Sequence, residues 1–150
     1  MILDIVENIG TKNVFTKLDL WWCYNNIWIK KGDEWKAVFT TPEGLFEPTV
    51  MFFRLMSSWM TFHTIMNKIL WDFINTREVA SFIDNVIVET EEEKGYNEIV
   101  EKVVRRLAEN DLYVKPEKYK WKVREVGLLG VVMKKNGIKI KEEKIKAVLN

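Results

Sequence analysis

The sequence has one cysteine, one histidine and no long apolar run. A single cysteine, Cys23, excludes an internal disulfide and fits a reducing compartment. The lone His63 has no Cys or His partner nearby in the sequence, so we assign it no metal role. No apolar run approaches the length that crosses a bilayer, and the N-terminal MILDIVENIG, which carries two acids, is not a signal peptide. We therefore expect an intracellular protein, cytoplasmic or nuclear, with no membrane partner.

The sequence also has no excess of positive or negative charge. Lys and Arg total 23 against 22 Asp and Glu, so the net charge gives no argument for a nucleic-acid or membrane partner. The charge is unevenly distributed, however, and residues 111–150 are rich in lysine. Such a region can follow a phosphate backbone, or it can be an ordinary solvated surface.

Apolar residues are abundant at 47%, with 13% aromatics, and 150 residues suit one domain with one core. Hydrophobic periodicity predicts helices at 2–9, from Ser57 to Ile74 and at 95–109, and strands at 14–20, 25–31 and 35–41. It also predicts hairpins at 35–50 and 80–90, and a third hairpin of strands 126–133 and 137–141 that turns at Asn136-Gly137. Helices mixed with frequent hairpins indicate an α+β fold with a mainly antiparallel sheet.

Two carboxylates stand within predicted strands. Asp19 lies in KLDL, and Asp84 lies between two apolar runs in ASFIDNVIVET, residues 80–90. The simplest interpretation of Asp84-Asn85 is a tight turn, because Asp and Asn tolerate the left-handed backbone. If the two strands are neighbours, however, both carboxylates meet at one edge of the sheet. Hard oxygen ligands there suit Mg²⁺, and such an arrangement serves in-line attack on a phosphate.

Longer blocks carry a family resemblance. FTKLDLWWCYNNIWIKKGDEWKAVFTTPEGLFEPTVMFFRL, TFHTIMNKIL, FIDNVIV, NDLYVKPEKYKWKVREVGLLGVVM and NGIKI together resemble the reverse transcriptase palm of gypsy-type long-terminal-repeat retrotransposons. The resemblance covers nearly the whole chain, and the order and spacing of the blocks make it specific. It implies a polymerase palm of ferredoxin-like type, with helices packed on one face of the sheet, spanning residues 1–150. The N-terminal part of the fingers, the thumb and the RNase H domain are expected to be absent.

The resemblance also implies roles for individual residues. Asp19 and Asp84 match the family's catalytic, metal-binding aspartates, with Mg²⁺ or Mn²⁺ as cofactor. Tyr24 matches the aromatic residue that favours deoxynucleotides, and Lys118 lies near the lysine-bearing loop that approaches the triphosphate. Residues 128–132, LLGVV, match the hairpin that holds the primer end, which gives Leu128, Leu129 and Gly130 a primer-grip role. The implied partners are an RNA or DNA template-primer and deoxynucleoside triphosphates.

The sequence departs from the family's pattern at positions that matter for chemistry. Asn85 stands where the family has a second aspartate, and loss of a preorganised charge at a reaction centre costs about 10²–10³ in rate. Arg54 stands where a glycine lets the nucleic acid approach closely. Cys23 and Trp59 replace a glycine and a proline. We therefore expect a degenerate copy whose core folds and whose catalysis is impaired.

Two other functions stay open from the sequence. One is a non-catalytic, domesticated palm that binds protein or nucleic acid. The other is a small two-carboxylate metal hydrolase that acts on phosphate esters. Edges of the sheet that are left unpaired would make self-association possible in any of these cases.

Overall fold

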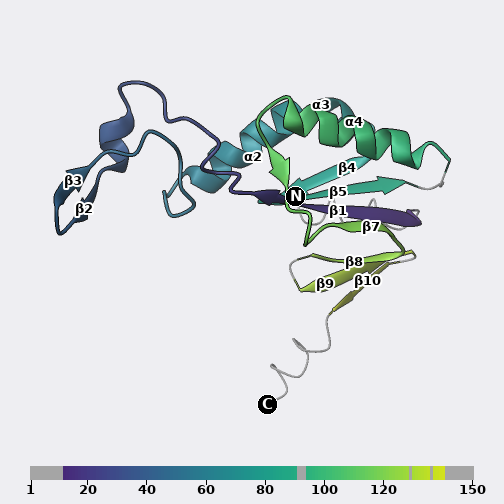
Figure 1. Ribbon diagram of the computed structural model, residues 1–150. Helices are drawn as coiled ribbons and strands as arrows, with labels where there is room; N and C mark the ends of the chain where they lie inside the picture. The colour runs from purple at the N-terminus through teal and green to yellow at the C-terminus, as the bar shows by residue number, and fades with distance from the viewer. Residues whose placement is uncertain (1–11, 91–93, 129, 136, 141–150) are drawn as a thin grey trace, which may run out of the picture.

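The computed structural model describes residues 12–90, 94–128, 130–135 and 137–140. Its centre is a five-stranded antiparallel sheet in the order β4-β5-β1-β6, in which β7 also pairs with β1 (Figure 1). The strands are β1 (Val14–Trp21), β4 (Val79–Phe82), β5 (Asn85–Thr90), β6 (Tyr113–Val114) and β7 (Lys120–Val123). The predicted strand at 14–20 and the hairpin at 80–90 are confirmed.

Three helices cover one face of this sheet, α2 (Ser58–Ile69), α3 (Trp71–Asn75) and α4 (Tyr96–Ala108) (Figure 1). The buried residues of α4 recur at steps of four and three and form one stripe: Tyr96, Val100, Val103 and Leu107. They pack against Leu18, Val86 and Val88 of the sheet in the larger of two hydrophobic cores. The α+β prediction, with helices on one face, is therefore confirmed.

The buried Thr16 of β1 links the sheet to α4 through hydrogen bonds. Its hydroxyl accepts a hydrogen bond from the Tyr96 phenol of α4 and another, at 3.1 Å, from the backbone N–H of Lys122 in β7. Burial raises the pKa of Tyr96 to about 12, so the phenol stays a donor throughout the physiological range.

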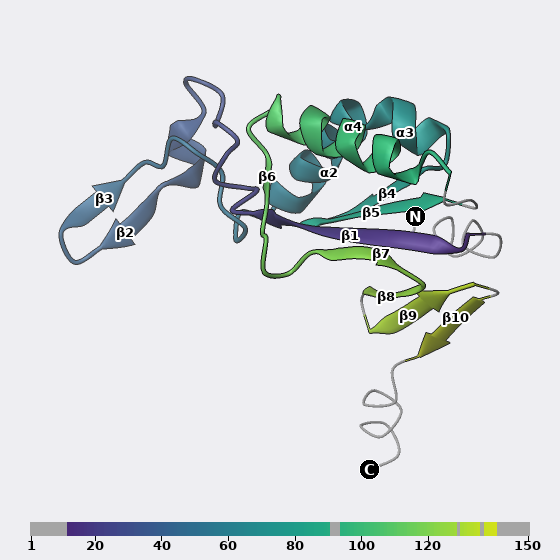
Figure 2. The same cartoon turned by 45° about the vertical axis from the view of Figure 1, so that its right-hand side comes forward.

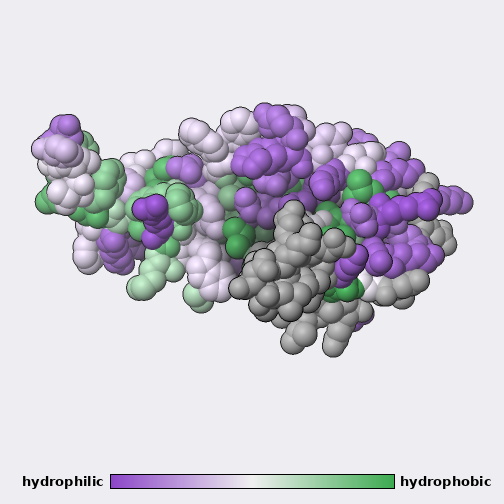
Figure 3. Space-filling model, turned by 90° about the horizontal axis from the view of Figure 1, so that it is seen from below, coloured by the Kyte–Doolittle hydropathy of each residue, from purple (hydrophilic) through white to green (hydrophobic). Residues whose placement is uncertain are grey.

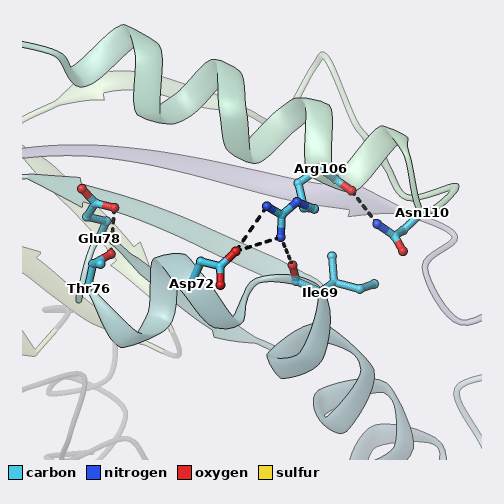
Figure 4. A network of polar contacts seen from close by, with 6 residues as sticks. All are labelled: Ile69, Asp72, Thr76, Glu78, Arg106 and Asn110. Atoms are coloured by element: carbon cyan, nitrogen blue, oxygen red, sulfur yellow. Dashed lines mark hydrogen bonds and ion pairs between the residues drawn. The ribbon is translucent and has the colours of Figure 1, made fainter.

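A polar cluster joins α3 to α4 at the outer surface (Figure 4). The Arg106 guanidinium donates to the Ile69 carbonyl at 3.0 Å and to the Asp72 carboxylate at 3.3 Å. It also lies 5.5 Å from the centre of the Phe73 ring. Because the Ile69 carbonyl is at the end of α2, this single side chain fixes the junction of α2 and α3 against α4.

The opposite face of the main sheet packs against a smaller antiparallel sheet (Figure 2). Its strands are β8 (Glu125–Leu128), β9 (Val131–Lys134) and β10 (Gly137–Ile140). Phe15 and Ile87 project from the main sheet and meet Val126, Leu128 and Met133 in a second core. The single strand predicted at 126–133 is wrong: it is divided into β8 and β9, because the chain turns at Gly130, where φ is +82°.

Residues 22–56 form an arm that projects from the main body and contains a 3₁₀ helix (Glu34–Ala37) and the hairpin of β2 (Phe39–Thr41) and β3 (Gly44–Phe46) (Figure 1). The strand predicted at 25–31 is wrong: these residues begin in a turn, and Trp28 makes only an isolated bridge to Val50. The predicted strand at 35–41 begins as the 3₁₀ helix. Figure 3 shows hydrophobic side chains gathered on this arm.

The helix predicted from Ser57 to Ile74 is interrupted at Leu70, which separates α2 from α3. The short strands β6 and β7 were not predicted. The helix predicted at 2–9 lies outside the described residues. In the part of the chain that the structure describes, no helix is both long and apolar enough to cross a membrane.

Candidate active site at the rim of the sheet

The pairing of β1 with β5 brings the two predicted acidic positions to the same end of the sheet. Asp19 lies directly opposite Asn85 in the antiparallel register. The next N–H of β1, that of Leu20, donates to the carbonyl of Asp84 at 2.8 Å. Asp19 and Asp84, which are 65 positions apart in the sequence, are therefore held at adjacent backbone positions by regular sheet hydrogen bonds.

The hairpin that carries Asp84 has a strained tip. Phe82 pairs with Asn85, so the two turn residues are Ile83 and Asp84, and the interpretation of Asp84-Asn85 as the turn is wrong by one residue. Ile83 takes φ +54°, a conformation that is rare for a β-branched side chain. The turn fixes the direction of the adjacent Asp84 at the cost of this local strain.

Asn85 holds the Asp84 carboxylate. Its side-chain amide donates to Asp84 Oδ1 at 2.8 Å. The Asn85 Oδ1 is buried and accepts no hydrogen bond from the residues that the structure describes. A buried acceptor without a donor is costly, and a cation or a water satisfies it. The residue that departs from the family's pattern thus still offers one oxygen at this rim.

Asp19 has a cationic neighbour on its own strand. The Lys17 ammonium lies 3.8 Å from Asp19 Oδ2, and only 19% of the lysine side chain and 13% of the aspartate side chain are exposed. Lys17 and Asp19 share the face of β1 that also carries Phe15, as the alternation of the strand predicts.

Asp84 lines a cleft of about 440 Å³ beside the rim. The lining residues are Leu20, Trp22, Cys23, Tyr24, Asn25, Phe53, Ile83, Asp84 and Lys115. Asp19 is not among them; it lies at the rim, one residue before Leu20. The structure therefore brings Tyr24 and Asp84 together in one cleft. Asp19 does not line that cleft, because its side chain lies on the face of β1 opposite to that of Leu20.

Burial and negative charge both act on the cleft's titratable groups. Burial, with a smaller contribution from the charge of Asp84, raises the pKa of the Cys23 thiol to about 11. Burial also raises the pKa of the Tyr24 phenol, and the nearby Cys23 and Asp84 act in the same direction. Both groups are neutral at physiological pH, so Cys23 is not a reactive thiolate.

The lysine in this cleft is Lys115, which sequence reasoning did not select. Its backbone N–H donates to the Asp19 carbonyl at 2.8 Å, and the preceding Val114 pairs with Leu20 of β1. Lys118 is exposed and does not line the cleft. Lys115 is placed by the pairing of the two-residue β6 with β1. A strand of two residues is too short to be recognised from a sequence pattern.

The predicted primer-grip residues lie in the smaller sheet. Leu128 is buried at 6% exposure and its side chain belongs to the second core. Gly130 occupies the turn between β8 and β9. Leu129 lies outside the described residues. Of the two described residues, only Gly130 lies in a turn.

Arg54 lies beside the cleft. It is exposed, and its guanidinium lies 5.5 Å from the centre of the ring of Phe53, a cleft residue. An arginine here adds bulk and positive charge next to a residue that lines the cleft.

The oxygen atoms at this rim can be compared with the ligands that a divalent cation needs. Among residues 12–90, 94–128, 130–135 and 137–140, no three His, Cys, Asp or Glu side chains are close enough to hold a metal ion between them. Two carboxylates and the unpaired Asn85 oxygen remain, and all are hard donors of the kind that Mg²⁺ prefers. The chemistry of these donors suits a cation that takes its other ligands from water and substrate phosphates.

The sequence of this chain matches a known protein family. Residues 2–133 match the family described as reverse transcriptase (RNA-dependent DNA polymerase). The chain belongs to this family. This reverse transcriptase domain is 28% identical over 149 residues to the Tf2-7 and Tf2-3 transposon polyproteins of Schizosaccharomyces pombe. The aligned region covers 99% of this chain, and this chain spans only 11% of the length of each polyprotein.

Solved structures share the fold of the reverse transcriptase domain. A foamy viral protease-reverse transcriptase in complex with double-stranded DNA aligns at a TM-score of 0.85 with 21% identity, covering all of this chain and 31% of that one. The same viral enzyme in complex with an RNA/DNA hybrid aligns at 0.80 with 22% identity, covering 95% of this chain and 20% of that one.

Proposed function

We propose that this domain is the palm of a gypsy-type retrotransposon reverse transcriptase, an RNA-directed DNA polymerase by descent whose nucleotidyl transfer is impaired in this chain. In this proposal residues 1–150 make up the palm unit, and the arm at 22–56 lies on the side of the incoming nucleotide. The substrates are deoxynucleoside triphosphates and an RNA or DNA template-primer.

One observation carries the proposal. The β1–β5 register places Asp19 opposite Asn85, and the Leu20 N–H donates to the Asp84 carbonyl, so the two acidic residues hold adjacent backbone positions at one end of the sheet. Asp84 lines the cleft there. That cleft also holds an aromatic residue, Tyr24, and a cation, Lys115. Carboxylates at a rigid rim, with a cation nearby, are suited to binding a metal-triphosphate and orienting it for in-line transfer.

Each side chain then has a defined task. Asp19, Asp84 and the Asn85 oxygen would hold Mg²⁺ or Mn²⁺, which supplies neutralisation of charge on the transferring phosphate. Tyr24 would occupy the space beside the sugar 2′ carbon and select deoxynucleotides. Lys115 would face the triphosphate across the cleft, while Lys118, from its exposed position, would act in the same loop. The turn at Gly130 would contact the primer backbone.

Asn85 is the main reason to expect impairment. An amide keeps an oxygen but supplies no negative charge, and its N–H₂ already occupies one oxygen of Asp84. Asp84 therefore has one lone-pair site fewer for a cation, and the rim has one charge fewer. Arg54 adds a positive charge and bulk next to a residue that lines the cleft. These changes act on the chemistry and leave the two cores intact.

The test is rescue of templated synthesis. We expect Asn85→Asp to raise the rate of primer extension on an RNA template with Mg²⁺ by about 10²-fold, and Arg54→Gly to add to it. Asp19→Asn in the rescued background should abolish the gain. Extension by the unmodified chain at the rate of Asn85→Asp would contradict the impairment.

Two outcomes would favour the alternatives. If neither variant extends a primer and Mn²⁺ does not bind to the rim by electron paramagnetic resonance, the non-catalytic binding module is favoured. Phosphate-ester hydrolysis without a template, abolished by Asp19→Asn, would indicate the two-carboxylate hydrolase. The exposed apolar arm is the observation that supports the binding module.

A further inference from the structure

Tyr24 stands on a turn and not on the sheet. It follows the end of β1, within a turn in which the Asn25 N–H donates to the Trp22 carbonyl and the Ile27 N–H donates to the Tyr24 carbonyl. No ladder of strand hydrogen bonds fixes its direction. The place of its ring within the cleft must therefore come from side-chain packing.

Phe62 provides that packing. The Tyr24 and Phe62 ring centroids are 5.0 Å apart, with their planes tilted by 48°. This is the geometry in which aromatic pairs attract through the edge of one ring and the face of the other. Phe62 is fully buried, at 0% exposure, so it cannot touch a nucleotide in the cleft.

Phe62 is itself rigidly held. It lies on α2, where Phe62 and Met66 are buried at a four-residue spacing, and Leu70 continues the same face. All three belong to the larger core, together with Cys23 and Leu20 from the margin of the cleft. The position of Phe62 is therefore determined by helix packing against the sheet and is independent of what occupies the cleft.

We propose that Phe62 is a positioning residue for sugar selection: it holds the Tyr24 ring against the space beside the sugar 2′ carbon and so sets the discrimination between deoxy- and ribonucleotides. This inference rests on the proposed function. It assigns that specificity to a contact between α2 and the turn after β1. Tyr24 alone, without its support, would move aside for a 2′-hydroxyl.

The first experiment reports on the ring without any need for activity. The chain has four tyrosines, so labelling with 3-fluorotyrosine gives four ¹⁹F resonances, and Tyr24→Phe assigns the one of interest. We expect Phe62→Leu to shift or broaden the Tyr24 resonance alone. The matched control is Phe15→Leu, which removes an equally buried phenylalanine from the second core and should leave the Tyr24 resonance in place.

The second experiment measures selection, in the Asn85→Asp background. We expect Phe62→Leu to lower the ratio of kcat/KM for deoxy- over ribonucleotide by roughly 3- to 10-fold, the factor that an aromatic pair is worth. The change should appear mainly as a lower KM for the ribonucleotide. Phe15→Leu should leave the ratio unchanged. If Phe62→Leu does not fold, Phe62→Met keeps the apolar volume and takes its place.

The outcomes separate the two proposals. An unmoved Tyr24 resonance in the Phe62 variant overturns this inference, whatever the activity. A moved resonance with an unchanged ratio also overturns it, since Tyr24 would then not depend on its support for selection. If Tyr24→Ala leaves the ratio unchanged, the assignment of Tyr24 as the selecting residue fails, and this inference fails with it, while a moved resonance would still establish the packing contact.

Discussion

Glu89 shows how one buried side chain can affect the whole protein. It lies on β5 opposite Phe15, on the face of the smaller sheet, and is 3% exposed. Within the described part of the chain, no group donates a hydrogen bond to its Oε2. Burial raises the pKa of this carboxyl from 4.5 to about 7, and the charge of Lys12 only partly opposes the shift. In the folded state, Glu89 is therefore mainly protonated below about pH 7.

The consequence is a stability that falls as pH rises. Because the folded pKa lies above the unfolded one, the folded state holds the proton more tightly between pH 4.5 and 7. Stability from this group is fully present below pH 4.5 and is lost as pH rises through 7, by an amount of about 3 kcal/mol. We expect Glu89→Gln to remove this dependence and to be the more stable protein above pH 7.

Urea denaturation at several pH values checks this prediction. The quantity of interest is the difference in unfolding free energy between the variant and the unmodified chain, because other titrating groups cancel in it. Glu125→Gln, at an exposed position in β8, is the control and should give a difference independent of pH. A difference for Glu89→Gln that is also flat from pH 4.5 to 8 would contradict the raised pKa.

At the scale of elements, the hairpin of β4 and β5 combines a well-paired ladder with a strained turn. Ile83, at φ +54°, is the first turn residue, and it is 38% exposed, so its side chain is not part of either core. A conformation of this kind costs roughly 1–3 kcal/mol, and glycine removes the strain at an entropic cost of about 0.5–1 kcal/mol.

We therefore expect Ile83→Gly to raise the free energy of unfolding by about 1 kcal/mol. Chemical denaturation followed by tryptophan fluorescence measures it. Ile138→Gly, on β10 outside the positive-φ region, is the matched control and should destabilise the protein, because it loses packing in the second core and relieves no strain. Destabilisation by both substitutions would show that the turn at Ile83 holds no releasable strain.

The elements also show what the sequence can predict. Strong periodicity identified β1, the β4–β5 hairpin and α4, because each buries one continuous face. The strand predicted at 25–31 failed because Ile27 and Ile29 alternate as in a strand, while the turn that begins at Trp22 leaves only the Trp28–Val50 bridge. The short strands β6 and β7 have too little apolar pattern for any prediction.

The candidate site, too, was only partly predictable from the sequence. Spacing alone left Asp19 and Asp84 as two strand carboxylates, and the family resemblance predicted that they meet. Lys115 entered only through the tertiary pairing of Val114 with Leu20. The unpaired Asn85 oxygen and the ring contact of Tyr24 are likewise properties of packing, which no local pattern in the sequence specifies.

At the scale of the whole molecule, burial is unevenly distributed. The main sheet is covered on both faces, by helices on one side and by β8–β10 on the other (Figures 1 and 2). The arm, in contrast, exposes large apolar side chains, including Trp28 at 75%, Leu45 at 72% and Phe53 at 70%. Its two-stranded hairpin is too small to be stable by itself, and both of its outer edges can accept another strand.

These features predict self-association through the arm. Residues 22–56 carry equal numbers of acidic and basic side chains, four of each, so no net charge keeps two arms apart. We expect sedimentation velocity to show a weight-average mass that increases with concentration, and the double variant Trp28→Ser with Leu45→Ser to shift it toward the monomer. Trp71→Ser, at a 61%-exposed tryptophan on the helical layer, is the control and should leave association unchanged. A monomer at every concentration, or an equal effect of Trp71→Ser, would exclude the arm as the interface.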